Sequence, residues 1–245
     1  MRSADSPDAL LRVNAVCVIA CLCVALSWLS VANAKTRFNH GELVQLRQLS
    51  DRGGPSFNAE LVSAIQRLDA TDAPELIAEL IFLFGELRYS CGGSRSALPA
   101  VEAASVLASL TGDASMAASL DGLAGQMAFT SNRTSNSARD RIMRALKAQR
   151  ATGRTLPLAR QLSAYATLLQ DINEFANAMR MSNEAVTLVE GDSSAKFGAI
   201  SSVALGAYYT HAELLRAIGD TNSALAAVEK LLKLSLQSDN QEFAG

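Results

Sequence analysis

Apolar residues recur through most of this chain at the three- and four-residue spacing of an α-helix. The clearest case is one helical face that carries a row of large apolar side chains: Leu76, Ile77, Leu80, Ile81, Phe84 and Leu87. Such a face has to be buried against a neighbouring element. Similar runs follow, each ended by Gly, Asn, Asp or Ser, and the sequence has no alternating strand pattern of useful length. The pattern therefore predicts an all-α fold.

Pairs of small residues, seven positions apart, recur in the later part of the chain. Seven residues make about two helical turns, so each pair marks a narrow stripe on one helix. The pairs start 41, 40 and 46 residues apart, and they are Ala97 with Ala104, Ala138 with Ala145, Ala178 with Ala185, and Ala224 with the larger Leu231. Small residues let a preceding helix approach closely. Periods of this length are typical of stacked helix pairs, none of which buries its apolar face alone.

Turn residues fall where such helix pairs need them. They precede the four small pairs at residues 91–94, 132–135, 171–173 and 219–222, and they separate the units at 111–113, 151–153 and 191–194. Glycine ends a helix by adopting positive φ, while Ser, Asp or Asn caps the next helix by accepting its free N–H bonds. We therefore expect two helices in each unit.

The fourth unit resembles a tetratricopeptide repeat, on a set of matching residues: Tyr208, Ala212, Leu215, Gly219-Asp220, Ala224, Leu231 and Leu234. A second match includes Phe84-Gly85, Tyr89, Gly92, Ala97 and Ala104. The two middle units lack most of the family's glycine and aromatic residues, and the period exceeds the usual length of about 34. The resemblance covers about residues 73–237 and is closest to the long-helix variants of bacterial regulators. It implies a right-handed α-solenoid of stacked antiparallel helix pairs in residues 73–245, preceded by capping helices in residues 35–72.

The first 34 residues have the pattern of a secretory signal peptide. An apolar run from Val13 to Ala34 follows Arg12 and ends in the small-x-small pair Ala32 and Ala34 before Lys35. Signal peptidase accepts small side chains at those two positions. We therefore expect an exported protein, located in the bacterial periplasm.

Two other interpretations of this segment remain open. About 20 apolar residues span a bilayer, so residues 13–34 could remain as an inner-membrane anchor. Residues 18–21 fit a loose lipobox that ends in Cys21, although apolar residues follow it where a lipid anchor usually has a polar tether.

Composition and residue types point away from catalysis and from nucleic acid. A formal charge of −2 does not fit a general nucleic-acid binder, which is usually basic. Removal of the leader leaves Cys91 as the single cysteine, so the sequence predicts no disulfide framework. The two histidines, His40 and His211, lie in no cluster with the spacing of metal ligands, and no nucleophile–base pair is recognisable. We expect no enzyme activity, no metal and no cofactor.

The resemblance also implies which residues contact a partner, because the first helix of each pair lines the groove of such an array. The positions carried over from the family are Phe82, Glu86, Tyr89, Met127, Thr130, Thr167, Gln170, Tyr209, Glu213 and Arg216. Concave surfaces of this kind bind peptides or helices. The implied partner is a protein or peptide.

A run of basic residues has only Asp140 in local opposition. Its members are Arg139, Arg141, Arg144, Lys147, Arg150 and Arg154, with Arg160 beyond. Such runs usually form a solvated outer face. The functional alternative is a basic patch for an acidic partner or for anionic lipid headgroups.

The leading hypothesis is therefore an exported scaffold that binds a protein or peptide in its groove. The sequence stops soon after the second helix of the fourth unit, without the polar terminal helix that arrays usually carry. This observation, with the resemblance to exported input regions of membrane signalling proteins such as diguanylate cyclases, leaves a second hypothesis open. In it the chain is the sensor module of a longer protein, although the cyclase signature is absent here.

Overall fold

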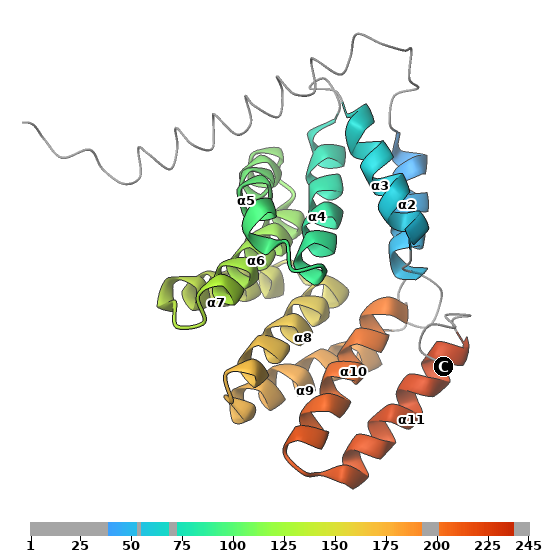
Figure 1. The fold of residues 1–245 in the computed structure, drawn as a ribbon, viewed down its shortest axis with the longest axis vertical. Helices are drawn as coiled ribbons and strands as arrows, with labels where there is room; N and C mark the ends of the chain where they lie inside the picture. The colour runs from blue at the N-terminus through green and yellow to red at the C-terminus, as the bar shows by residue number, and fades with distance from the viewer. Residues whose placement is uncertain (1–38, 53–54, 69–72, 193–200, 238–245) are drawn as a thin grey trace, which may run out of the picture.

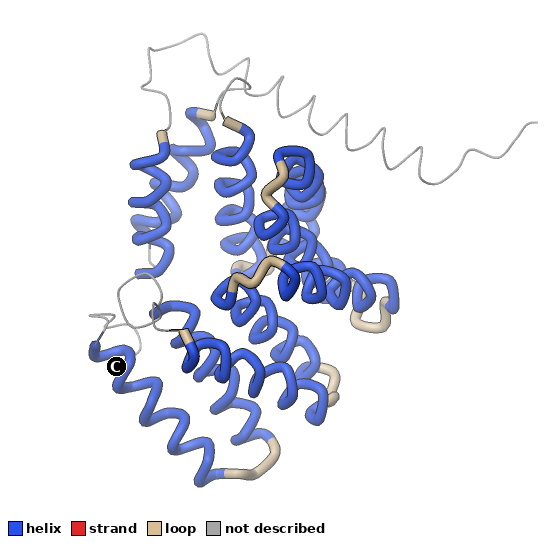
Figure 2. The backbone as a smooth tube through the Cα atoms, turned by 180° about the vertical axis from the view of Figure 1, so that it is seen from behind, coloured by secondary structure: helices blue, strands red, loops and turns tan. Residues whose placement is uncertain are grey.

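The computed structural model describes residues 39–52, 55–68, 73–192 and 201–237. The predicted signal segment at residues 1–34 lies outside these ranges. Within them the chain is all-helical, as Figure 2 shows, so the prediction of an all-α fold is confirmed. The helices are α2 (His40–Arg52), α3 (Pro55–Arg67), α4 (Pro74–Ser90), α5 (Ser94–Thr111), α6 (Ala114–Ser131), α7 (Asn136–Ala151), α8 (Thr155–Asp171), α9 (Phe175–Gly191), α10 (Ser201–Ala217) and α11 (Thr221–Gln237).

The helices pack in neighbouring pairs, and each contacts the next one along the chain (Figure 1). Turns of two to four residues join most of them, so consecutive helices run antiparallel. In addition, α4 contacts α6, α6 contacts α8, and α8 contacts α10, while α2 contacts both α4 and α10. The even-numbered helices therefore form a continuous layer. This arrangement is compatible with a helical repeat.

The stripes of small residues lie on α5, α7, α9 and α11, and both members of every pair are buried. They allow the close approach that the sequence predicts. A Cβ atom added to Gly125 of α6 would lie 2.8 Å from Cγ1 of Ile142 and 3.4 Å from the backbone oxygen of Ala138. On α4, a Cβ atom at Gly85 would lie 2.7 Å from Cγ2 of Val101. Glycines on one helix thus face alanine stripes on the next.

Two of the predicted turns show how the helices begin and end. Gly112 follows α5 with φ of 82°, the left-handed conformation that glycine adopts without strain. Asp113 then caps α6, because its Oδ1 accepts a hydrogen bond from the backbone N–H of Met116 at 2.9 Å. Ser135 caps α7 in the same way through the N–H of Ala138. These caps direct each helix back along its predecessor.

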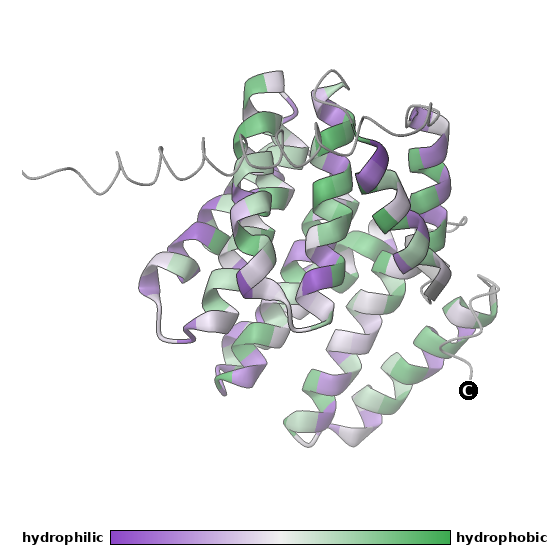
Figure 3. Cartoon of the chain, turned by 45° about the horizontal axis from the view of Figure 1, so that its top comes forward, coloured by the Kyte–Doolittle hydropathy of each residue, from purple (hydrophilic) through white to green (hydrophobic). Residues whose placement is uncertain are grey.

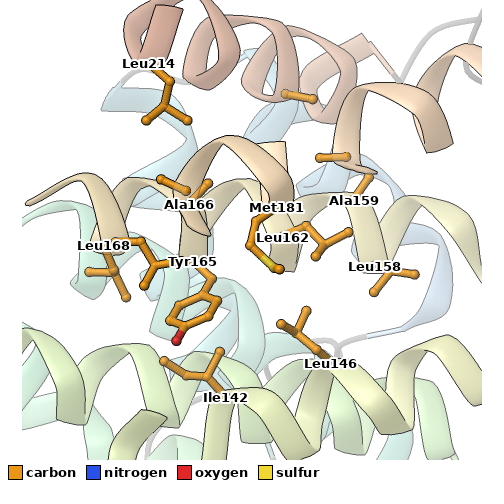
Figure 4. Packing of buried hydrophobic residues seen from close by; sticks show 14 of the residues in the cluster. Ile142, Leu146, Leu158, Ala159, Leu162, Tyr165, Ala166, Leu168, Met181 and Leu214 are labelled. Atoms are coloured by element: carbon orange, nitrogen blue, oxygen red, sulfur yellow. The ribbon is translucent and has the colours of Figure 1, made fainter. Parts of the chain in front are cut away.

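The largest part of the core joins α6 to α10. Figure 4 shows Ile142 and Leu146 of α7 facing Leu162 and Tyr165 of α8, with Met181 of α9 beside them. A second cluster joins α4, α5 and α6, and a third joins α2, α3 and α4. Burial of these side chains fixes the layer of even-numbered helices, and that layer carries the candidate site.

Candidate functional site

A cavity of about 360 Å³ lies on one face of this layer, which we call the inner face. Five helices contribute to its wall: α4, α6 and α8 supply most of it, and α2 and α10 supply Arg47 and Val203. The turns before α6 and α8 add Asp113 and Arg154. Segments more than 150 residues apart in the sequence therefore meet around one space.

Side-chain amides from two helices form part of the wall. Gln161 of α8 is 6% exposed, and its Nε2 donates to the backbone oxygen of Ala118 at 3.0 Å. Its side chain lies against Gly122 of α6, where an added Cβ atom would be 3.0 Å from Oε1 of Gln161. Gln126 of α6 is 4% exposed, and its side-chain amide makes no hydrogen bond within the described part of the chain. Because this amide can still donate and accept hydrogen bonds, the wall is suited to a polar ligand.

Charged residues of both signs surround the amides. Glu79 pairs with Arg47 across 2.5 Å, and Glu86 pairs with Arg160 across 3.2 Å. Arg154 lines the same cavity, and its guanidinium makes no ion pair among the described residues. Three arginines thus oppose three carboxylates, since Asp113 completes the acidic set. The cavity is balanced in charge.

Glu79 has a perturbed carboxyl group in the cavity wall. Burial raises the pKa of its carboxyl group, and the positive charge of Arg47 offsets only part of that effect. Its Oε1 contacts Arg47, whereas Oε2 is buried and has no hydrogen-bond partner among the residues that the structure describes. Oε1 of Gln161 is buried without a partner in the same way. Both of these oxygen atoms are hydrogen-bond acceptors, so a ligand that donates hydrogen bonds would satisfy them.

Apolar side chains complete the wall. They come from α4, α6, α8 and α10, and comprise Phe82, Leu83, Met116, Leu123, Leu156, Pro157, Ala164 and Val203. Most small-ligand sites combine a largely apolar wall with a few placed polar groups. The cavity has both.

The structure separates the residues that the resemblance placed in the groove. Phe82 and Glu86 line the cavity. Tyr89, Thr130 and Thr167 line a shallower hollow of about 550 Å³ at the far ends of α4, α6 and α8, where the hydroxyls of Tyr89 and Thr130 are 3.4 Å apart. Burial raises the pKa of the Tyr89 hydroxyl. The residues expected in one groove thus contribute to two neighbouring depressions.

The prediction that Met127 lines the groove is wrong. Met127 is 0% exposed and packs in the core cluster of α4, α5 and α6. Adjacent residues on a helix point about 100° apart, and it is Gln126 that lines the cavity. Gln126 lies four residues before Thr130 on the same face, and it is a polar residue in an apolar helix. That signal was available in the sequence, as it was for Gln161.

The remaining predicted contacts line neither depression. Gln170 of α8 is half-buried, and Tyr209 of α10 is exposed. Arg216 forms an ion pair with Glu213 across 2.8 Å, one helical turn away on α10. Their role in partner binding stays a prediction.

The basic run is not one continuous basic surface. Arg139 pairs with Glu174, Arg141 with both Glu102 and Asp121, and Arg150 with Glu184. These carboxylates come from other helices, so the local sequence did not reveal them. Arg144 and Lys147 are exposed on α7, while Arg154 and Arg160 belong to the cavity wall. The run therefore serves partly to join successive helix pairs.

Other reactive groups among the described residues do not form a site. No three His, Cys, Asp or Glu side chains in those ranges could hold a metal ion. Oγ of Ser182 and Nδ1 of His211 are 3.2 Å apart, but Ser182 is fully buried and is closed to a substrate. Cys91 is exposed. In the described ranges, every helix falls short of the length and apolarity needed to cross a membrane.

Comparison with known proteins adds no assignment. The chain matches no protein-family model and no curated protein sequence.

Proposed function

We propose that this chain is an exported helical-repeat scaffold that binds a protein or peptide partner on its inner face. In this proposal the helix pairs form a right-handed solenoid similar to tetratricopeptide repeats. The contacts of α4 with α6, of α6 with α8 and of α8 with α10 support it, as does the burial of every small-residue pair. Binding is the whole of the activity, without bond making.

The cavity is the observation that carries the proposal. It joins an aromatic side chain, Phe82, to buried amides and to charged groups of both signs. Such a surface offers apolar contact area and hydrogen bonds that a peptide can satisfy with its backbone and side chains.

Selection of displayed random peptides on the immobilised full chain tests this function. We expect peptides that bind with Kd in the micromolar range, and at least tenfold weaker binding to Phe82→Ala. The control is Val106→Ala, because Val106 is 57% exposed on α5 and lies outside the cavity. Equal loss in both variants, with both folded by circular dichroism, would refute inner-face binding.

A second function is favoured by the contact between α2 and α10, which brings opposite ends of the described chain together beside the cavity. A closed site of this kind suits the sensor module of a longer membrane signalling protein. A reading frame that continues from Gly245 into an output domain would support the sensor. Intact mass by cell fraction tests export: a soluble species that begins at Lys35 supports it, and a membrane-bound species that keeps residues 1–34 supports an anchor.

A further inference from the structure

We propose that the cavity binds a small zwitterion, a free amino acid or dipeptide with an apolar side chain. The inference goes beyond the proposed scaffold function, because the ligand is a dissolved small molecule instead of a segment of a partner protein. It rests on the dimensions of the cavity, its charge pattern and its unpartnered polar atoms.

The dimensions favour a small ligand. Ligand pockets usually span about 300–1,000 Å³, and this cavity of about 360 Å³ lies at the lower end. Its wall is drawn from five helices, and α2 contacts α10 beside it. A single amino acid or a dipeptide fits inside the space.

The orphaned oxygens fit an ammonium group. Oε2 of Glu79 and Oε1 of Gln161 are buried acceptors without donors, and an ammonium carries three donors. The carboxylate of Glu79 also offers the opposite charge. Phe82 lies one turn along α4 from Glu79, and Glu86 lies one turn further, so the same helical face combines an aromatic ring with two carboxylates. Aromatic faces attract cations.

Arg154 fits the carboxylate of the same ligand. It stands in the turn before α8, lines the cavity, and makes no ion pair among the described residues. The other two arginines of the wall are already paired with glutamates. Because the wall is balanced in charge, a ligand with one charge of each sign leaves it balanced. A ligand with a single charge would leave either Glu79 or Arg154 without its proposed partner.

Other residues of the wall can contact the uncharged parts of the ligand, which are its peptide unit and its apolar side chain. The unpartnered amide of Gln126 can pair with the peptide unit of a dipeptide, since a side-chain amide both donates and accepts. Met116, Leu156 and Pro157 offer an apolar surface to the ligand's side chain. These residues come from α6 and α8.

Isothermal titration of the full chain tests the proposal with a panel of free protein amino acids and leucyl-leucine. We expect at least one apolar member to bind with Kd below about 1 mM. Its N-acetyl and amide derivatives, each lacking one charge, should bind at least tenfold more weakly. Glucose and maltose are the neutral polar controls. The proposal fails if no panel member binds, if the singly charged derivatives bind equally well, or if only the sugars bind.

Two variants locate the site. Glu79→Gln should weaken zwitterion binding at least tenfold, and so should Arg154→Ala, which removes an exposed side chain. Arg144→Ala, an exposed arginine on α7 outside the cavity, is the matched control and should bind like the native chain. Unchanged affinity in Arg154→Ala would overturn the assignment. If zwitterions do not bind while selected peptides still require Phe82, this inference fails and the proposed scaffold function stands.

Discussion

At the scale of single residues, side-chain size and burial decide what each position tolerates. Gly125 and Gly206 both lie inside helices, yet their surroundings differ. An added Cβ atom at Gly125 would approach the backbone nitrogen of Ile142 to 3.2 Å, whereas one at Gly206 would meet nothing within 4 Å. A backbone atom cannot move aside as a flexible side chain can.

Gly125→Ala should therefore destabilise the fold by roughly 1–3 kcal/mol through overpacking. Gly206→Ala is the matched control, and it should be neutral or stabilise the fold by up to about 1 kcal/mol, because alanine favours the helix. Urea denaturation measures both. Equal effects would show that α6 and α7 are not in the close contact described here.

His211 gives the fold a dependence on pH. Burial lowers the pKa of its imidazole; the negative charge of Glu190 raises it, and Lys230 lowers it. The folded-state pKa thus lies below the unfolded value of about 6.5. The neutral ring is favoured in the fold, so its stabilising contribution is present above about pH 6.5 and is lost as the pH falls through the lower folded-state pKa.

Below about pH 6.5 the free energy of unfolding should therefore decrease as the pH falls, and His211→Gln should reduce that slope. Thermal melts at several pH values measure it. The carboxylates with lowered pKa, such as Glu174 and Glu190, act at lower pH. Burial raises the pKa of Glu79, which opposes this trend, but Glu79 is the same in the native chain and in His211→Gln, so the difference between the two isolates the histidine. An unchanged slope in His211→Gln would assign the dependence to other groups.

At the scale of the element, a cap and an interhelical amide hold α6 in place. Asp113 supplies the cap. Gln149 of α7 is fully buried, donates to Ser115 Oγ at 3.0 Å, and accepts from Ser119 at 3.5 Å. Both serines belong to the first turns of α6, so two independent contacts fix the helix that carries Gln126 into the cavity wall.

Asp113→Ala should lower stability by about 1 kcal/mol, since it removes the acceptor at the N-cap. Asp113→Asn keeps a good capping side chain and should lose much less. Chemical denaturation of the two variants separates capping from charge: an equal loss in both would mean that the negative charge of Asp113 matters and the cap does not.

Gln149→Ala should cost roughly 1–3 kcal/mol or more, because it leaves buried serine hydroxyls without their partner. The comparison is Gln48→Ala on α2, an exposed glutamine, which should change stability by less than about 0.5 kcal/mol. Denaturation midpoints give both values, and a small loss at Gln149 would contradict its bridging role.

At the scale of the whole molecule, the helices differ in how many neighbours cover them. α6 contacts α4, α5, α7 and α8, whereas α11 packs chiefly on α10. The last helix consequently exposes four large apolar side chains: Leu225, Val228, Leu232 and Leu236. Figure 3 colours several segments of α11 as hydrophobic. Local stability follows the density of such contacts.

Amide hydrogen exchange should therefore be fastest in α11 among the helices from α4 onward, and slowest in α6 and α8. Mass spectrometry of exchanged peptides measures it at neutral pH. Protection of α11 equal to that of α6 in the isolated chain would show that something else covers its apolar side.

The sequence by itself determined the helices, the turns that join them, and the stripes of small residues along which neighbouring helices pack. Helical periodicity, caps and small residues act over a few residues, so Ala138 and Ala145 revealed a buried stripe without any structure. Phe82 and Glu86 were placed in the groove by the family resemblance alone, and both line the cavity. The sequence did not show how α6 is rotated about its own axis. Met127 was therefore predicted at the groove, whereas the structure places Gln126 in the cavity wall.

Only the tertiary structure decided which distant residues share a space. Arg47, Glu79, Arg154 and Gln161 lie around one cavity because five helices from separate units converge there. The partners of the basic run came from other helices for the same reason, as in the pair of Arg150 with Glu184. Charge balance and unpartnered atoms depend on distances across the layer, and those distances are set by packing between helices, which periodicity along one helix does not encode.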